Sequence, residues 1–111
     1  MRQAFVSHGW DDLLFNPRLF LTDGRFLADP DVYHSSGVCL EVDSRERHFS
    51  VESWEATMRR HGAMTAAGLS VLHVPPSRFR ADPDGVIAEV AGAVDVRRGW
   101  PAPPVVLREA G

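Results

Sequence analysis

Apolar and polar positions alternate between residues 38 and 43, the pattern of a β-strand that buries one face against a core. Valine or leucine occupies every second position. Cys39, Glu41 and Asp43 therefore share the opposite face. The pattern predicts a strand at the centre of a sheet, with two carboxylates on one of its faces.

Two further apolar runs precede this strand, at residues 18–22 and 25–33. Between them lies Asp23-Gly24, a pair typical of a tight hairpin turn because glycine tolerates the left-handed backbone that such turns need. Together with residues 38–43, these runs predict three consecutive antiparallel strands.

A helix is predicted over residues 51–67, with Ser50 as N-cap and Gly68 as its C-terminal stop. Apolar residues recur there at three- and four-residue spacing, which indicates one buried stripe. The side chains expected on this stripe are Trp54, Met58, His61 and either Met64 or Thr65.

Residues 69–74 form another apolar run and predict a strand. Because strand–helix–strand crossovers are right-handed and join parallel strands, this strand is expected parallel to residues 38–43. A short helix over residues 1–9 and a final helix over 83–95 complete the pattern. The predicted fold class is α/β, a mixed sheet flanked by helices.

The length of 111 residues suits a single domain, predicted over residues 1–95, followed by a proline-rich tail at 96–111 that is extended or disordered. No apolar run reaches the roughly 20 residues that span a bilayer. The single cysteine, Cys39, cannot form an internal disulfide, which suits a reducing compartment. We expect a cytoplasmic protein without a membrane segment.

The net charge of −3 argues against nucleic-acid binding by bulk electrostatics, since such domains are usually basic. Local arginine pairs can still contact phosphate, although each pair taken alone favours a solvated surface. The pairs are Arg45 with Arg47, Arg59 with Arg60, Arg78 with Arg80, and Arg97 with Arg98.

The carboxylates of Glu41 and Asp43 would repel each other on one strand face, and a bound cation removes that repulsion. Hard ions such as Mg²⁺ prefer carboxylate oxygens. Asp31, at the end of the preceding extended segment, would add a third oxygen if that segment pairs beside the strand. The alternative from spacing alone is an ordinary strand whose polar face meets water.

Pro30-Asp31, Glu41-Val42-Asp43 and His48 together resemble the core of a bacterial family grouped with the very-short-patch mismatch-repair endonucleases, in the PD-(D/E)XK nuclease superfamily. The dipeptide matches the first half of that motif and Glu41-Val42-Asp43 the second. His48 stands where these endonucleases carry a histidine. The similarity covers roughly residues 15–95 and includes the sequences WEATMRRH, MTAAG and VLHV.

The resemblance implies a restriction-endonuclease-like αβββαβ core and metal-dependent cleavage of DNA. The implied metal is Mg²⁺ or Mn²⁺, held by Asp31, Asp43, Glu41 and the backbone carbonyl of Val42. His48 would act as general acid or base, since a histidine pKa of about 6.5 suits neutral pH. The side chains implied to contact phosphate are Arg45 and Arg47.

Departures from the superfamily pattern keep other functions open. The chain has no lysine, and Asp43 occupies the position of the superfamily's lysine, as is common in this branch. The first helix of the core is short, so an upstream domain is a possibility. A catalytically inactive nuclease fold that binds DNA or protein is the main alternative, and a small-molecule hydrolase with the same metal site is a third. The oligomeric state is left open.

Overall fold

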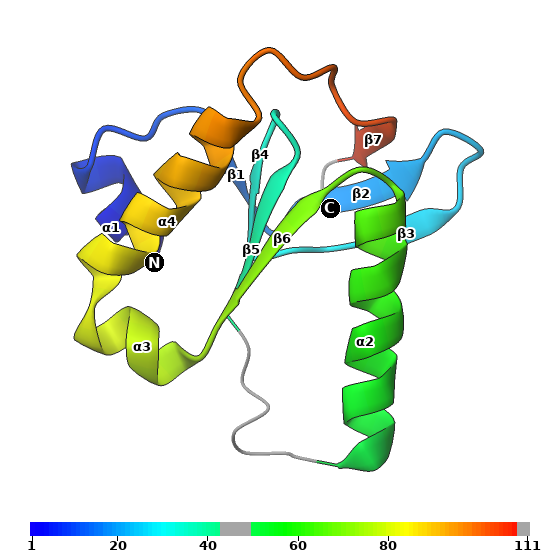
Figure 1. Cartoon of the computed structure of the whole chain (residues 1–111), viewed down its shortest axis with the longest axis horizontal. Helices are drawn as coiled ribbons and strands as arrows, with labels where there is room; N and C mark the ends of the chain where they lie inside the picture. Colours follow the sequence, from blue (N-terminus) through cyan, green and yellow to red (C-terminus); the bar gives the residue numbers. More distant parts are fainter. Residues whose placement is uncertain (43–49, 109–111) are drawn as a thin grey trace.

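The computed structural model describes residues 1–42 and 50–108. Its main sheet has four strands in the order β1-β4-β5-β6. β1, β4 and β5 pair antiparallel, and β5 pairs parallel with β6 (Figure 1). The bounds of these strands are Leu13–Phe15 for β1, Val32–His34 for β4, Val38–Val42 for β5 and Ser70–Val74 for β6.

A second sheet of three strands has the order β3-β2-β7. Both of its pairings are antiparallel, and β2 lies in the middle. Its strands are β2 at Arg18–Leu21, β3 at Phe26–Ala28 and β7 at Val105–Arg108. β7 lies within residues 96–111, which the sequence predicted to be an extended or disordered tail. Its backbone pairs with β2, which also pairs with β3, so β2 has a hydrogen-bonded neighbour on each edge.

The prediction of three consecutive antiparallel strands is wrong, because residues 25–33 form two strands in different sheets. β3 pairs with β2 in the second sheet, whereas β4 pairs with β5 in the main sheet. β1, and not residues 18–22, pairs with β4. The chain turns out of the main sheet after β1, where Asn16 has a left-handed φ of 55° and Pro17 follows. The hairpin at Asp23-Gly24 forms as predicted, with Gly24 at φ 93°, but it belongs to the second sheet.

Helices cover both faces of the main sheet (Figure 1). Side chains of one face, among them Val38 and Leu40, pack against Phe5 and Ile87. Cys39 packs on the opposite face with Met64, so the predicted alternation along β5 is confirmed. The α/β class with a mixed, helix-flanked sheet is confirmed too, and the element order is compatible with an αβββαβ core. The helices are α1 at Arg2–Ser7, α2 at Val51–Ala66, α3 at Pro76–Ala81 and α4 at Pro83–Val96.

Helix α2 connects β5 to β6 and begins at Ser50, whose hydroxyl accepts the backbone N–H of Ser53 at 3.1 Å, as expected of an N-cap. Its predicted buried stripe is only partly correct. Met64 is fully buried, but Trp54 and Met58 expose 43% and 52% of their surface. Burial is confined to the C-terminal half of the helix, which packs beside β3 and β6.

Arg97 is a buried cation that ties separate turns together. Its guanidinium donates to the carbonyl oxygens of Ser36 and Gly68 and to the Ser70 hydroxyl. These acceptors lie in the β4–β5 turn and the α2–β6 connection. Gly37 beside it has a φ of 102°, and a Cβ there would lie 2.6 Å from the Arg97 Nη2 atom. A glycine is therefore required on both backbone and steric grounds.

We predict that Arg97→Ala lowers the free energy of unfolding by about 2–4 kcal/mol, because buried carbonyl groups lose a charged donor. The matched control is Arg98→Ala. Arg98 is exposed and pairs with Asp95 one turn away, so its loss should cost under about 0.5 kcal/mol. Urea denaturation of both variants measures the difference, and equal losses would contradict the role given to Arg97.

Alkaline pH should destabilise the fold through two buried groups that face each other on β4 and β5, Tyr33 and Cys39. Burial raises the pKa of Tyr33 from 10.0 to about 12, helped by the neighbouring Cys39. Burial, and then the charge of Glu41, raise the pKa of Cys39 from 9.0 to about 12. The unfolded chain releases these protons at lower pH than the folded chain, so the stability they contribute is complete below pH 9 and is lost toward pH 12.

The composition makes this prediction specific, because the chain has one tyrosine, one cysteine and no lysine. The melting temperature should fall steadily between pH 9 and 11.5. In Tyr33→Phe/Cys39→Ala it should start lower and change much less over that range. A wild-type melting temperature that stays constant over the same range would contradict the raised pKa values.

Candidate functional site

Asp31 lies at the start of β4, beside the end of β5. Its Oδ2 atom accepts the backbone N–H of Val42 at 2.8 Å. The sequence expectation that the segment of Asp31 pairs beside the strand of Glu41 is met by the β4–β5 pairing. A carboxylate has about four acceptor positions on two oxygens, so one N–H donor leaves capacity for a cation. The bond fixes a half-buried carboxylate at the backbone between Glu41 and Asp43.

Glu41 points to the other helix layer and is almost completely buried, with 7% of its surface exposed. Its Oε2 atom accepts a hydrogen bond of 2.7 Å from Nη2 of Arg60 on α2. Nδ1 of His73 lies 3.8 Å from the same oxygen. Burying a carboxylate is costly unless a cation pairs with it. The Arg60 guanidinium supplies that charge, and its own side chain is 42% exposed to water.

His73 and Arg60 are the partners of Glu41 that the sequence did not reveal. His73 stands directly opposite Glu41 in the parallel β5–β6 register. Its ring lies against that of His61 from α2, with ring centres 4.7 Å apart. A histidine inside an otherwise apolar strand was the available signal. No sequence signal indicated the pairing of Arg60 with Glu41, because this pairing depends on how α2 is rotated over the sheet.

A shallow pocket of about 220 Å³ adjoins Asp31 on the side of α3. Val42, Phe79 and Arg80 help to line it. The two predicted carboxylates thus meet different surroundings, since Asp31 borders this pocket and Glu41 is enclosed between α2 and β6. Arg80 is a cation within the same pocket as Asp31, and it belongs to one of the arginine pairs considered above.

The remaining predicted site residues lie outside the part of the chain that the structure describes. They are Asp43, His48, Arg45 and Arg47. Across residues 1–42 and 50–108, no group of three histidine, cysteine or acidic side chains is arranged to hold a metal ion. Asp31 and Glu41 alone therefore do not complete a metal centre. The predicted ligand set depends on Asp43.

Comparisons with protein-family models, curated proteins and solved structures found no match to this chain. The resemblance to the very-short-patch-repair endonucleases stays a prediction that rests on its motif residues. Within the described residues, no helix combines the length and apolar character needed to cross a membrane.

We predict that Arg60→Ala lowers the free energy of unfolding by about 2 kcal/mol, because the buried Glu41 carboxylate loses its cation. The value lies below the roughly 3–5 kcal/mol of a fully buried pair, since water reaches Arg60. Adding Glu41→Gln should recover part of the loss by removing the charge.

Arg59→Ala is the matched control for that measurement. Arg59 precedes Arg60 on α2 and is exposed, so its removal should change the stability by less than about 0.5 kcal/mol. The thermodynamic cycle for Arg60 and Glu41 is measured by urea denaturation. A coupling energy near zero would mean that the ion pair contributes nothing to folding.

Proposed function

We propose that this protein is a metal-dependent DNA endonuclease of the very-short-patch-repair-like type. The observation that supports it best is the hydrogen bond from Val42 N–H to Asp31. It brings the aspartate of the Pro-Asp pair to the end of β5, the strand that carries Glu41 and Val42. The order of helices and strands is compatible with the αβββαβ core on which such a motif functions.

The proposed metal ligands are Asp31, Asp43, Glu41 and the Val42 carbonyl oxygen, an all-oxygen set that suits Mg²⁺ or Mn²⁺. A divalent ion at such a set activates water and neutralises phosphate charge. The chain's own contribution is orientation. Val42 N–H fixes one oxygen of Asp31, and His48 gives or takes a proton at the reacting phosphodiester.

Phosphate contacts are assigned to Arg45 and Arg47, which come two and four residues after Asp43 in the sequence. An arginine fork binds two phosphate oxygens at once. Arg80, which lines the pocket beside Asp31, is a third cation for the same purpose. The proposed location is the cytoplasm. The single cysteine is buried and forms no internal disulfide, which suits a reducing compartment, and the proposed substrate, DNA, is present there.

The direct test is nicking of a supercoiled plasmid with 5 mM Mg²⁺ or 1 mM Mn²⁺, concentrations of about the scale at which weak oxygen sites fill. We predict that Asp31→Asn reduces the rate about 100-fold or more, because a charge that acts on the transition state is lost. Asp29→Asn, at an exposed position two residues earlier, should retain the wild-type rate.

Two outcomes would contradict the proposal. One is wild-type protein that does not nick the plasmid with either metal. The other is nicking that survives both Asp31→Asn and Asp43→Asn, which would indicate a contaminating nuclease.

A catalytically inactive nuclease fold is the second candidate, and the Glu41–Arg60 ion pair favours it. Arg60 already supplies the positive charge that a metal would otherwise bring. The two candidates differ in how Arg60→Ala behaves. If Glu41 is a metal ligand, Mg²⁺ should raise the melting temperature of Arg60→Ala more than that of the wild type, because binding to the folded state stabilises it. If the fold is an inactive module, Mg²⁺ should leave both melting temperatures unchanged.

A further inference from the structure

His34 ends β4 with only 11% of its side chain exposed, and a polar partner lies on each side of its ring. Its Nε2 atom lies 2.8 Å from Oδ2 of Asp12, and its Nδ1 atom lies 2.8 Å from Oγ of Ser36. Trp10 packs edge-on against the imidazole, with ring centres 5.8 Å apart. A carboxylate, an imidazole and a hydroxyl in a hydrogen-bonded series are the groups that make a serine nucleophilic in hydrolases.

The main sheet brings these three residues together. β1 pairs antiparallel with β4 and places Leu13 opposite His34, so Asp12, the residue before Leu13, reaches the same ring. Ser36 belongs to the turn between β4 and β5. In this turn the backbone N–H of Gly37 donates to the carbonyl oxygen of His34 at 2.8 Å. The series thus lies on the sheet and on a tight, hydrogen-bonded turn of its central hairpin.

The backbone of Ser36 determines which nitrogen of His34 carries the proton. Its N–H can only donate, and it lies 3.1 Å from Nδ1. Nδ1 of the neutral ring is therefore the acceptor, and the ring proton is on Nε2, which donates to the Asp12 carboxylate. The Ser36 hydroxyl then donates to Nδ1 as well. The imidazole is placed as a general base for this hydroxyl, with Asp12 as the acceptor behind it.

A pocket of about 300 Å³ lies between this turn and the C-terminal end of α4. His34 and Ser36 line it from the sheet, and Val94 and Trp100 give it an apolar side. Arg97 lines it too, and its guanidinium donates to the carbonyl oxygen of Ser36. A fixed positive charge beside the hydroxyl favours the negative charge that develops when an acyl group is attacked. The volume is at the lower end of the range for ligand sites and suits a small substrate.

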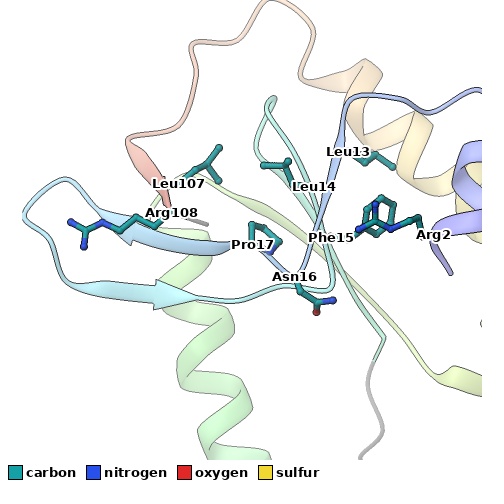
Figure 2. Close-up of a pocket in the computed structure, with 8 residues that line it drawn as sticks. All are labelled: Arg2, Leu13, Leu14, Phe15, Asn16, Pro17, Leu107 and Arg108. Carbon is teal, nitrogen blue, oxygen red and sulfur yellow. The ribbon is translucent and has the colours of Figure 1, made fainter. Parts of the chain in front are cut away.

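A larger pocket, of about 600 Å³, lies between β1 and β7 and lacks such groups (Figure 2). Apolar side chains form most of its lining, among them Leu14 and Leu107. The described residues around it include no serine, histidine, cysteine or acidic residue. Figure 2 shows the Arg108 guanidinium directed away from these leucines. The smaller pocket is therefore the one that combines enclosed volume with a reactive group.

We propose that Ser36 is a nucleophile activated by His34, and that the pocket at Trp100 binds small acyl esters for hydrolysis. The site is separate from the proposed cleavage of DNA. Asp31 and Val42 lie at one end of the paired strands β4 and β5, and Ser36 lies in the turn at the other end.

The reaction forms and breaks one ester bond in each half. Ser36 Oγ bonds to the ester carbonyl carbon while its proton passes to Nδ1 of His34. The bond from that carbon to the leaving alcohol breaks, Nδ1 gives its proton to the leaving oxygen, and the acyl group stays on Ser36. Water then attacks the acyl carbon, its proton passes through Nδ1 to Ser36 Oγ, and a carboxylic acid is released. Asp12 orients the ring and stabilises the imidazolium in both halves.

The first test uses a fluorophosphonate probe, which bonds through phosphorus to an activated serine and releases fluoride. We expect mass spectrometry to find one adduct, on Ser36. His34→Gln should slow labelling about 100-fold, the scale of a lost general base, and Asp12→Asn about tenfold or more. Hydrolysis of p-nitrophenyl acetate should fall in the same order. Ser7→Ala, at an exposed serine of α1, should keep the wild-type rates.

A second test does not depend on how well any ester fits the pocket. Ser36→Cys places a thiol beside Nδ1, and a neighbouring base increases the fraction of reactive thiolate. Iodoacetamide at pH 7 should alkylate this thiol about tenfold or more faster than the thiol of Ser35→Cys, although Ser35 is the more exposed position. Cys39 is buried and the chain has no lysine, so the added thiol dominates the signal.

The outcomes distinguish a reactive serine from a structural turn. Labelling of Ser36 that falls in Asp12→Asn while the melting temperature stays within a few degrees of the wild type supports the proposal. Wild-type protein that forms no adduct overturns the hydrolase activity, and equal alkylation of Ser36→Cys and Ser35→Cys overturns activation by His34. In that case the three side chains serve only to hold the β4–β5 turn against β1.

Discussion

The cost of burying Glu41 determines how the two layers of this fold fit together. β5 is paired on both edges and covered on both faces, so a carboxylate on it has little access to water. Arg60 supplies the compensating charge from α2, and His73 adds a polar neighbour from β6. The ion pair therefore joins α2 to β5, and it adds to the packing of the buried Met64 that holds the helix against the sheet. The Glu41 carboxylate of β5 thus contacts both the connecting helix α2, through Arg60, and β6, through His73.

That unit places the candidate site at one end of the sheet. Asp31 approaches the end of β5 from β4 and is fixed by the Val42 N–H, while Glu41 faces the opposite layer. Nuclease activity would require the carboxylates of Asp31 and Glu41 to bind one cation together with Asp43. An interaction module needs only the ion pair as it stands. The choice depends on whether Mg²⁺ can take Glu41 from Arg60.

Local patterns were sufficient for most of the fold. Alternation identified β5 and its two faces, the Asp23-Gly24 pair identified a hairpin, and the crossover rule gave the parallel β5–β6 pair. The sequence did not indicate that the hairpin would leave the main sheet, because a left-handed Asn16 before Pro17 is not apparent from polarity. β7 was missed for a related reason, since its partner β2 is far away in the sequence. In the candidate site, motif spacing in the sequence predicted Asp31 and Glu41. Arg60 and His73 could not be predicted as partners of Glu41, because their positions depend on the packing of α2 and the register of β6.

The most direct test of the site is where a paramagnetic ion binds. In a two-dimensional ¹H–¹⁵N NMR spectrum, Mn²⁺ at a small fraction of the protein concentration should broaden the amide signals of Asp31 and Val42. Signals of Ser36 and Gly37, at the opposite end of the β4–β5 hairpin, should persist, and Asp31→Asn should abolish the selective loss. Uniform broadening, or broadening centred on another acidic surface, would contradict a metal site at Asp31 and Glu41 and leave the ion pair with Arg60 as the purpose of the buried carboxylate.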